Sequence, residues 1–161
     1  MFRAPLLNDA LEERHPMTDR RPMTVYWDRS CGLCRGEMEA LNLEAYGFIM
    51  SDCSAPGFSD EHANACGITP DDMLNALHVC DADGVWYRGI DAFEIIYRRA
   101  GHTAIADWLA RPGLRPLHDR LYATVARNRH WLSRLGLARP WSALIKRMQA
   151  RKAAQRELGH H

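Results

Sequence analysis

The sequence lacks long hydrophobic runs. Nowhere in its 161 residues does it approach the ~20 consecutive apolar residues that a membrane-spanning helix needs. Residues 1–22 also lack the apolar segment of a secretory signal, because their longest apolar run is the short stretch from Ala4 to Leu7. We therefore predict no transmembrane segment and interpret residues 1–22 as a poorly ordered leader.

The cysteines are odd in number. A chain with no secretion signal and five cysteines is not expected to carry a structural disulfide framework, so a reducing compartment fits better and we predict a cytoplasmic location. The five are Cys31, Cys34, Cys53, Cys66 and Cys80. Internal repeats and low-complexity tracts are also missing, which together with the length favours one main core.

The net charge of +1 hides a strong asymmetry along the chain. Residues 1–97 hold 7 basic and 17 acidic side chains, a balance of −10, whereas residues 98–161 hold 14 basic and 3 acidic, a balance of +11. Such a split can mark a docking surface for nucleic acid or an anionic membrane. The simpler interpretation, which we prefer, is that the two parts attract each other or present solvated basic helices.

A strand followed by a helix is predicted near the first two cysteines. Met23–Asp28 is rich in β-branched and aromatic residues, as in a buried strand. From Cys31 the periodicity becomes helical, and Gly47 is the natural stop. One face of this helix would hold Cys34, Met38, Leu41 and Ala45.

The following residues predict a small mixed α/β arrangement with additional helices. Asp83-Gly84 is a strong hairpin signal, and Thr69 before Pro70 is typical of a helix start. The remaining predicted elements are a strand at 48–50, a helix at 59–66 capped by Ser59, hairpin strands at 76–80 and 85–88, and a helix after Gly89. Next come a short helix at 104–110, a long helix with Leu117, Leu121, Val125, Leu132 and Leu135 on one face that stops near Gly136, and a last helix from Pro140 with Trp141, Leu144, Ile145 and Met148 on one side.

Cys31-Gly-Leu-Cys34 is the motif that carries chemistry. A Cys-x-x-Cys pair can be a redox dithiol, half of a zinc site or two inert core cysteines. Zinc would need two more ligands, and Cys53 with Cys66 are too far apart in sequence to form a second tight pair. The junction between strand and helix favours the redox dithiol.

The two thiols are predicted to have unequal roles. Cys31, at the helix N-terminus, would be exposed and acidic, because free N–H groups and the helix dipole stabilise a thiolate there. Cys34 would turn toward the core, stay protonated and act as the resolving thiol. Asp28, three residues before Cys31, would either relay a proton or position the loop.

Other polar candidates are interpreted more simply. Cys53, Cys66 and Cys80 are predicted to be structural, and His78 is predicted to be a core or edge histidine within a strand. No bound cofactor is implied by these residues.

Residues Tyr26-Trp-Asp-Arg-Ser-Cys-Gly-Leu-Cys34 resemble the Asp-x-x-Cys-x-x-Cys signature of the DCC family of predicted thiol-disulfide oxidoreductases. Asp28, Cys31 and Cys34 occupy its three named positions. The resemblance continues through His78–Phe93 and reaches Ala126-Arg-Asn-Arg129, so it covers residues 23–136.

The resemblance implies a thioredoxin-like α/β fold with a small mixed four-stranded sheet, flanking helices and extra C-terminal helices. It also implies dithiol redox activity, but little about the substrate. We further predict a thioredoxin-like domain at 23–110, a helical extension at 111–158 that packs on or trails the same domain, and exchange with a protein or small-molecule disulfide, with an external reductant. Two departures stand out: Arg29 replaces the usual glycine, and no proline stands near Leu77 and His78, where thioredoxins carry a cis-proline.

Overall fold

The computed structural model describes residues 21–158, apart from the side chains of residues 138, 141, 152, 153 and 155–158. The predicted leader, except for residues 21 and 22, lies outside the described residues. Among the described residues, no helix is long and apolar enough to cross a membrane.

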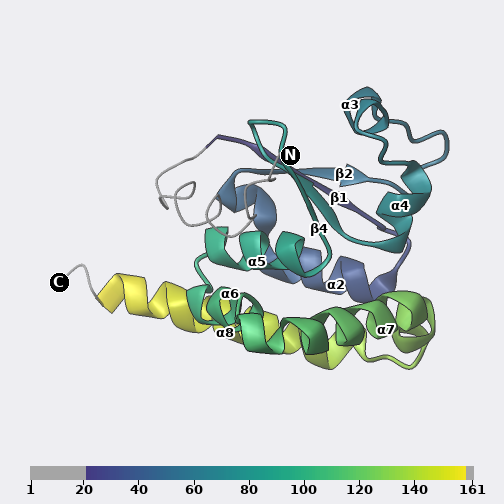
Figure 1. Ribbon diagram of the computed structural model, residues 1–161. Coiled ribbons are helices and arrows are strands. Elements are labelled where there is room, and N and C mark those ends of the chain that lie inside the picture. Colours follow the sequence, from purple (N-terminus) through teal and green to yellow (C-terminus); the bar gives the residue numbers. More distant parts are fainter. Residues whose placement is uncertain (1–20, 159–161) are drawn as a thin grey trace.

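Four strands and a series of helices follow one another along the chain (Figure 1). In order they are β1 (Met23–Trp27), α2 (Gly32–Leu41), the 3₁₀ helix η1 (Leu43–Tyr46), β2 (Phe48–Asp52), α3 (Glu61–Ala65), α4 (Pro70–Asn75), β3 (His78–Cys80), β4 (Trp86–Arg88), α5 (Ile90–Arg99), α6 (Thr103–Leu109), η2 (Pro112–Leu114), α7 (Arg115–Arg134) and α8 (Ala138–Leu158).

The strands form one mixed sheet with the order β2-β1-β3-β4. β1 runs parallel to β2 and antiparallel to β3, and β3 pairs antiparallel with β4. Val25 in β1 therefore stands between Met50 and Val79. The predicted four-stranded mixed sheet and the thioredoxin-like α/β class are confirmed.

The two faces of the sheet have separate cores, because successive side chains of a strand point to opposite faces. Met23, Val25 and Trp27 of β1 belong to the main core, which α2 and α5 also build. Tyr26 belongs to a smaller cluster on the other face, completed by Cys53, Ala63, Met73 and Cys80. α3 and α4 supply two of these residues, so short helices cover this second face.

The C-terminal helices pack onto the helices beneath the sheet, and Figure 1 shows α7 and α8 as the outermost layer on that side. Ile145 of α8 is 1% exposed and belongs to the main core. Gln149 donates a hydrogen bond to the Leu41 carbonyl at 3.0 Å and accepts one from Tyr46 at 3.2 Å. α8 thus holds the C-terminal end of α2 in place.

Turn and cap residues confirm several local predictions. Thr69 forms a reciprocal capping box with Asp72 at the start of α4. In the hairpin, Asp81 accepts the backbone N–H groups of Asp83 and Val85 at 2.9 Å each, and Gly84 has a φ of 80°. Gly136, with a φ of 77°, follows the end of α7 as expected.

Two predicted helix boundaries were wrong. α2 ends at Leu41 rather than near Gly47, because Asn42 adopts a left-handed φ of 50° and starts the 3₁₀ turn. Asn tolerates this conformation better than most residues. α3 is capped by Asp60 rather than Ser59, since the Asp60 carboxylate accepts the Ala63 N–H at 2.9 Å.

The buried face of α7 also differs from its apolar stripe. Leu117, Leu121 and Leu135 are 61%, 56% and 56% exposed. The buried residue of this helix is His118. Its packing side instead includes Tyr122 and Arg129, which point to the elements around the cysteine pair.

Candidate redox site

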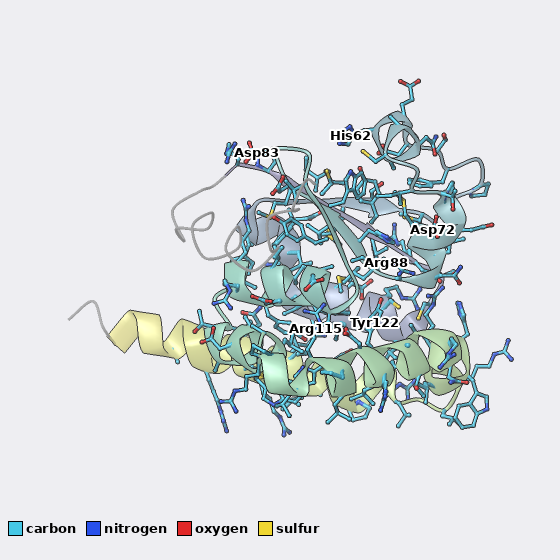
Figure 2. All side chains as sticks on the ribbon, viewed as in Figure 1. His62, Asp72, Asp83, Arg88, Arg115 and Tyr122 are labelled. Atoms are coloured by element: carbon cyan, nitrogen blue, oxygen red, sulfur yellow. The ribbon has the colours of Figure 1, made fainter. Side chains whose placement is uncertain are left out.

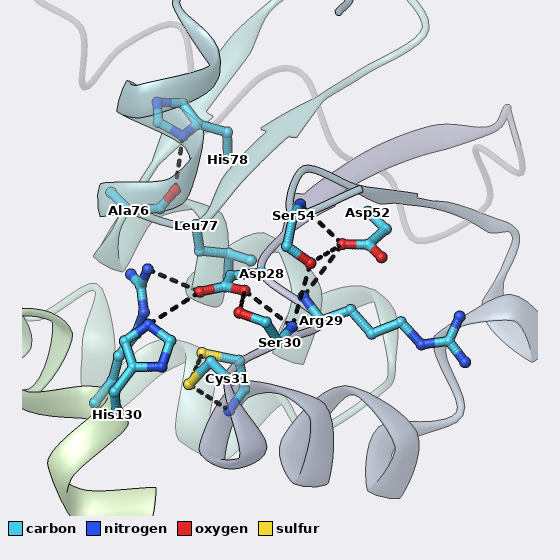
Figure 3. Close-up of polar contacts among 12 residues, drawn as sticks. Asp28, Arg29, Ser30, Cys31, Asp52, Ser54, Ala76, Leu77, His78 and His130 are labelled. Carbon is cyan, nitrogen blue, oxygen red and sulfur yellow. Dashed lines mark hydrogen bonds and ion pairs between the residues drawn. The ribbon is translucent and has the colours of Figure 1, made fainter. Parts of the chain in front are cut away.

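The loop between β1 and α2 is organised by Asp28, which follows the last residue of the strand. Its Oδ1 accepts the Ser30 N–H at 2.9 Å and the Ser30 hydroxyl at 2.5 Å (Figure 3). The Asp28 carbonyl accepts the Cys31 N–H at 3.3 Å. Asp28 is 5% exposed, and both its carboxylate and its carbonyl accept hydrogen bonds from residues of this loop.

Cys31 is the N-cap residue of α2, with extended backbone angles. Its Sγ accepts the Cys34 N–H at 3.4 Å and the Cys34 thiol at 2.9 Å. Both cysteines are free. The helix N-terminus therefore presents its backbone donors and its positive dipole end to the Cys31 sulfur.

These contacts separate the acidities of the two thiols. The hydrogen bond from Cys34 is the largest influence that lowers the pKa of Cys31, from 9.0 to about 6; the N–H groups of Cys34 and Leu33 and the charge of Arg129 also lower this pKa, against the opposing effect of burial. The same bond, together with burial, raises the pKa of Cys34. The first proton of the pair therefore leaves from Cys31, and the remaining Cys34 proton stays in the hydrogen bond between the two sulfurs.

The exposure of the two sulfurs differs from expectation. Cys31, predicted to be exposed, is completely buried, whereas Cys34 packs on the main core yet is partly exposed. Next to Cys31, α7 passes so close to the start of α2 that Ser133 Oγ occupies the space a Cβ on Gly32 would need. The sequence analysis treated this helix as an extension and gave it no role at the site.

Two side chains of α7 reach Asp28. Arg129 Nη2 donates to Asp28 Oδ2 at 2.9 Å, and His130 Nε2 lies 3.4 Å from the same oxygen (Figure 3). Their side chains are 13% and 55% exposed. Sequence reasoning missed both as site residues, although the family resemblance included Ala126-Arg-Asn-Arg129 and was the available signal.

A third residue of α7, Tyr122, closes the loop before β3. Its hydroxyl oxygen accepts the Leu77 N–H at 2.8 Å, and its ring lies 3.1 Å from the place of a Cβ on Gly89. Tyr122 stands on the side of α7 that faces the sheet (Figure 2). The backbone donor of Leu77, in the loop where thioredoxins have their cis-proline, is thus occupied from within the chain.

Comparison with protein families matches residues 25–135 to the DCC1-like thiol-disulfide oxidoreductases. The chain belongs to this family. The match spans well over half of the chain and runs from β1 through α7, so the helix that covers the cysteine pair lies within the family region. Comparisons with curated proteins and with solved structures gave no match.

Within this family member, the other cysteines lie apart from the pair. Cys53 and Cys80 are buried in the second core, where burial raises their pKa to about 12 and about 11. Cys66 is exposed at the end of α3. None of these positions brings a further thiol to α2.

His78 is buried in β3, as predicted for a core histidine. Its Nδ1 bonds the Ala76 carbonyl at 2.9 Å, and burial lowers its pKa. Over residues 21–158, the structure contains no cluster of three or more His, Cys, Asp or Glu side chains suited to a metal ion. The zinc alternative therefore finds no ligand set in the described part of the chain.

Proposed function

We propose that this chain is a thiol-disulfide oxidoreductase that uses Cys31 and Cys34 as its redox pair. One observation carries the proposal: two sulfurs 2.9 Å apart at a helix N-terminus, with the pKa of Cys31 lowered to about 6 and that of Cys34 raised. An inert core pair has no need of this polarisation. The five cysteines fit work in a reducing compartment such as the cytoplasm.

The reaction has two steps. The Cys31 thiolate attacks one sulfur of a protein or small-molecule disulfide, which breaks that disulfide and releases one thiolate that takes a proton. Cys34 then loses its proton and attacks the Cys31 sulfur of the mixed disulfide, which releases the second thiol. The pair is left oxidised, the substrate has gained two electrons, and an external reductant must restore the dithiol.

Asp28 acts in this scheme as a positioning residue. Its carboxylate oxygens bond Ser30 and Arg129, which fixes the loop before Cys31 and brings a cation near the thiolate. Among the hydrogen bonds of the described residues, none joins the Asp28 carboxylate to either sulfur. Of the two roles considered for Asp28, these contacts favour loop positioning over proton relay.

The test is redox cycling of the purified chain with single cysteine variants. Oxidised wild type should lose two hydrogens by intact mass, and the reduced form should reduce hydroxyethyl disulfide. Cys31→Ser and Cys34→Ser should each abolish formation of this internal disulfide. Cys66→Ser is the matched control, because Cys66 is exposed at the end of α3, which lies away from α2 (Figure 1). Loss of activity in Cys66→Ser together with retention in Cys31→Ser would refute the proposal.

A further inference from the structure

The outer side of α7 exposes large apolar side chains to solvent. Leu117, Leu121, Trp131 and Leu135 are each more than half exposed. At about 100° per residue, these four positions fall within an arc of about 80° on the helix surface. They therefore form one row, which we call the apolar stripe, rather than the scattered single residues that are normal on a protein surface.

Two polar residues, Thr124 and Asn128, lie along the apolar stripe and direct a donor into the helix itself. The Thr124 hydroxyl donates to the Arg120 carbonyl at 2.9 Å, and the Asn128 side-chain amide donates to the Thr124 carbonyl at 2.8 Å. Donors that are bonded in this way do not depend on water. The stripe can therefore leave bulk water at a lower cost than its two polar residues suggest.

A row of arginines runs beside the apolar stripe. Arg120, Arg127 and Arg134 recur every seven residues and are all exposed. They lie about 60–100° around the helix from Leu117, all on the same side of the stripe. Among the described residues, no ion pair joins any of these three arginines to an acidic group. Their charges are therefore available to an external anion.

The positive charge continues into α8. Residues 120–156 contain eight Arg and two Lys, and neither Asp nor Glu. In α8, Arg139, Lys146, Arg147 and Arg151 are exposed, and Figure 1 shows α8 with α7 on the side of the molecule away from the sheet. This side attracts anionic partners. Basic helices that were merely solvated would not need exposed leucines and a tryptophan, so the apolar stripe goes beyond the simpler interpretation of the charge asymmetry.

The combination of an apolar stripe and an arginine row favours one class of partner. A nucleic acid would bind the arginines through its phosphates, but its backbone offers nothing that matches exposed leucines. A second copy of the chain in a symmetric dimer would place the same patch against itself, so its arginines would face these arginines. An anionic bilayer offers both charged headgroups for the arginines and acyl chains for the leucines.

We propose that α7 docks the chain on an anionic lipid surface, with α8 adding positive charge. The helix lies parallel to the membrane, the apolar stripe enters the boundary between headgroups and acyl chains, and the arginines reach the lipid phosphates. Trp131 suits this depth, because the indole ring has an apolar body and an N–H that can reach the headgroups. This docking surface goes beyond the proposed redox function and does not depend on it.

The first test is sedimentation of the full chain with vesicles. Vesicles of phosphatidylcholine alone are compared with vesicles of equal parts phosphatidylcholine and phosphatidylserine. At about 0.1 M salt, we expect partitioning into the vesicles with phosphatidylserine to be about tenfold stronger or more, and to weaken as the salt rises to about 0.5 M, because salt screens the attraction. Equal partitioning into both kinds of vesicle, or none into either, would overturn the proposal.

The second test separates the arginine row from the net charge of the chain. Arg120→Gln with Arg127→Gln should weaken partitioning into the phosphatidylserine vesicles about tenfold or more. Arg29→Gln with Arg88→Gln is the matched control, because it removes two exposed charges from the loop before α2 and from β4. Partitioning of this control should stay within about twofold of wild type, because its charges lie off the docking surface. Equal losses in the two variants would overturn the assignment to α7.

The third test removes the apolar part of the surface. Trp131→Ser with Leu135→Ser should weaken partitioning about tenfold or more, whereas Ile49→Ser, at an exposed position of β2, should not change it. Thermal melting checks that both variants fold. A wild-type dimer that the Trp131→Ser, Leu135→Ser variant abolishes in sedimentation velocity would overturn the proposal in favour of a second copy. Tighter binding to duplex DNA than to vesicles, unchanged in this variant, would overturn it in favour of nucleic acid.

Tryptophan fluorescence measures whether the apolar stripe enters the bilayer. Lipids brominated near the headgroup end of their acyl chains quench a tryptophan that inserts among them. The fluorescence of the bound chain should be quenched, and Trp131→Phe should remove most of this quenching. Trp86→Phe should keep it, because Trp86 packs against the second core on the other face of the sheet. Unchanged quenching in bound Trp131→Phe would overturn insertion of the stripe.

Discussion

Arg129 Nη2 lies 2.9 Å from Asp28 Oδ2, and this ion pair joins residues 101 positions apart in the sequence. The side chains are 13% and 4% exposed. The pair fastens the last turns of α7 to the loop that leads into α2. The same ion pair therefore holds α7 against this loop and fixes the position of the Arg129 charge, which lowers the pKa of Cys31.

Replacing Arg129 with Gln should destabilise the fold, because the Asp28 carboxylate would stay buried without its cation. Breaking a buried pair in this way typically costs about 3–5 kcal/mol, and the contact from His130 should keep the loss near the lower end. Urea denaturation measures the change in the free energy of unfolding. Arg127→Gln, on the exposed side of α7, should stay within about 0.5 kcal/mol of wild type.

The double variant Asp28→Asn with Arg129→Gln distinguishes the interaction between the two side chains from the contribution of each side chain to stability. Because neither member is then charged, part of the stability should return. If the losses of the two single variants simply add, Asp28 and Arg129 do not interact and this account of the α7 contact is wrong.

Removal of the Cys34 thiol should raise the Cys31 pKa, because the hydrogen bond from Cys34 is its largest lowering influence. A hydrogen bond to a charged group is worth about 1.5–3 kcal/mol, so Cys34→Ala should raise this pKa by roughly one to two units. Thiolate absorbance in the ultraviolet follows the titration, with Cys31→Ser as the blank. In Cys34→Ser the Cys31 pKa should rise less, because the serine hydroxyl can still donate a hydrogen bond to the Cys31 sulfur. Equal Cys31 pKa values in Cys34→Ala and Cys34→Ser would contradict the assignment of the low pKa to this hydrogen bond.

Local sequence signals were sufficient for individual strands, for turns and for the start of α2, whereas the mixed four-stranded sheet was predicted from the family resemblance. Three of these signals are short-range, because each depends only on residues a few positions apart. They are the β-branched and aromatic run of β1, the Asp83-Gly84 turn and the Thr69 capping box. The spacing of Cys31 and Cys34 likewise depends on one helical turn. These features could be predicted because no distant part of the chain alters them.

The surroundings of the site could not be predicted in this way. Whether Cys31 is exposed depends on where α7 lies, and that follows from contacts such as Ser133 against Gly32. Amphipathic periodicity was misleading here, because Leu117 and Leu121 remain exposed while the polar Arg129 faces inward. A buried ion pair between distant residues leaves no periodic signal in a single sequence.

Tyr122→Phe should weaken the contact of α7 with the loop before β3. The change removes the oxygen that accepts the Leu77 N–H and leaves that donor without its partner, at a cost of about 1–3 kcal/mol in unfolding free energy. Native-state hydrogen exchange at the Leu77 amide should accelerate more than exchange at Val79, which belongs to a strand ladder. Equal acceleration at both amides would indicate general destabilisation instead.

The pH dependence of oxidation provides the most direct check on the pair. Thiolate is the reactive form, so the rate with hydroxyethyl disulfide should rise as the pH increases through about 6 and level off by about pH 8. A thiol with the ordinary pKa of 9.0 would instead gain rate steadily through that range. Arg129→Gln removes a positive charge near Cys31, so its profile should shift to higher pH, whereas Arg127→Gln should follow wild type. Stopped-flow mixing across pH 4–10 measures these profiles, and a wild-type rate still climbing tenfold per pH unit at pH 8 would refute an acidic Cys31.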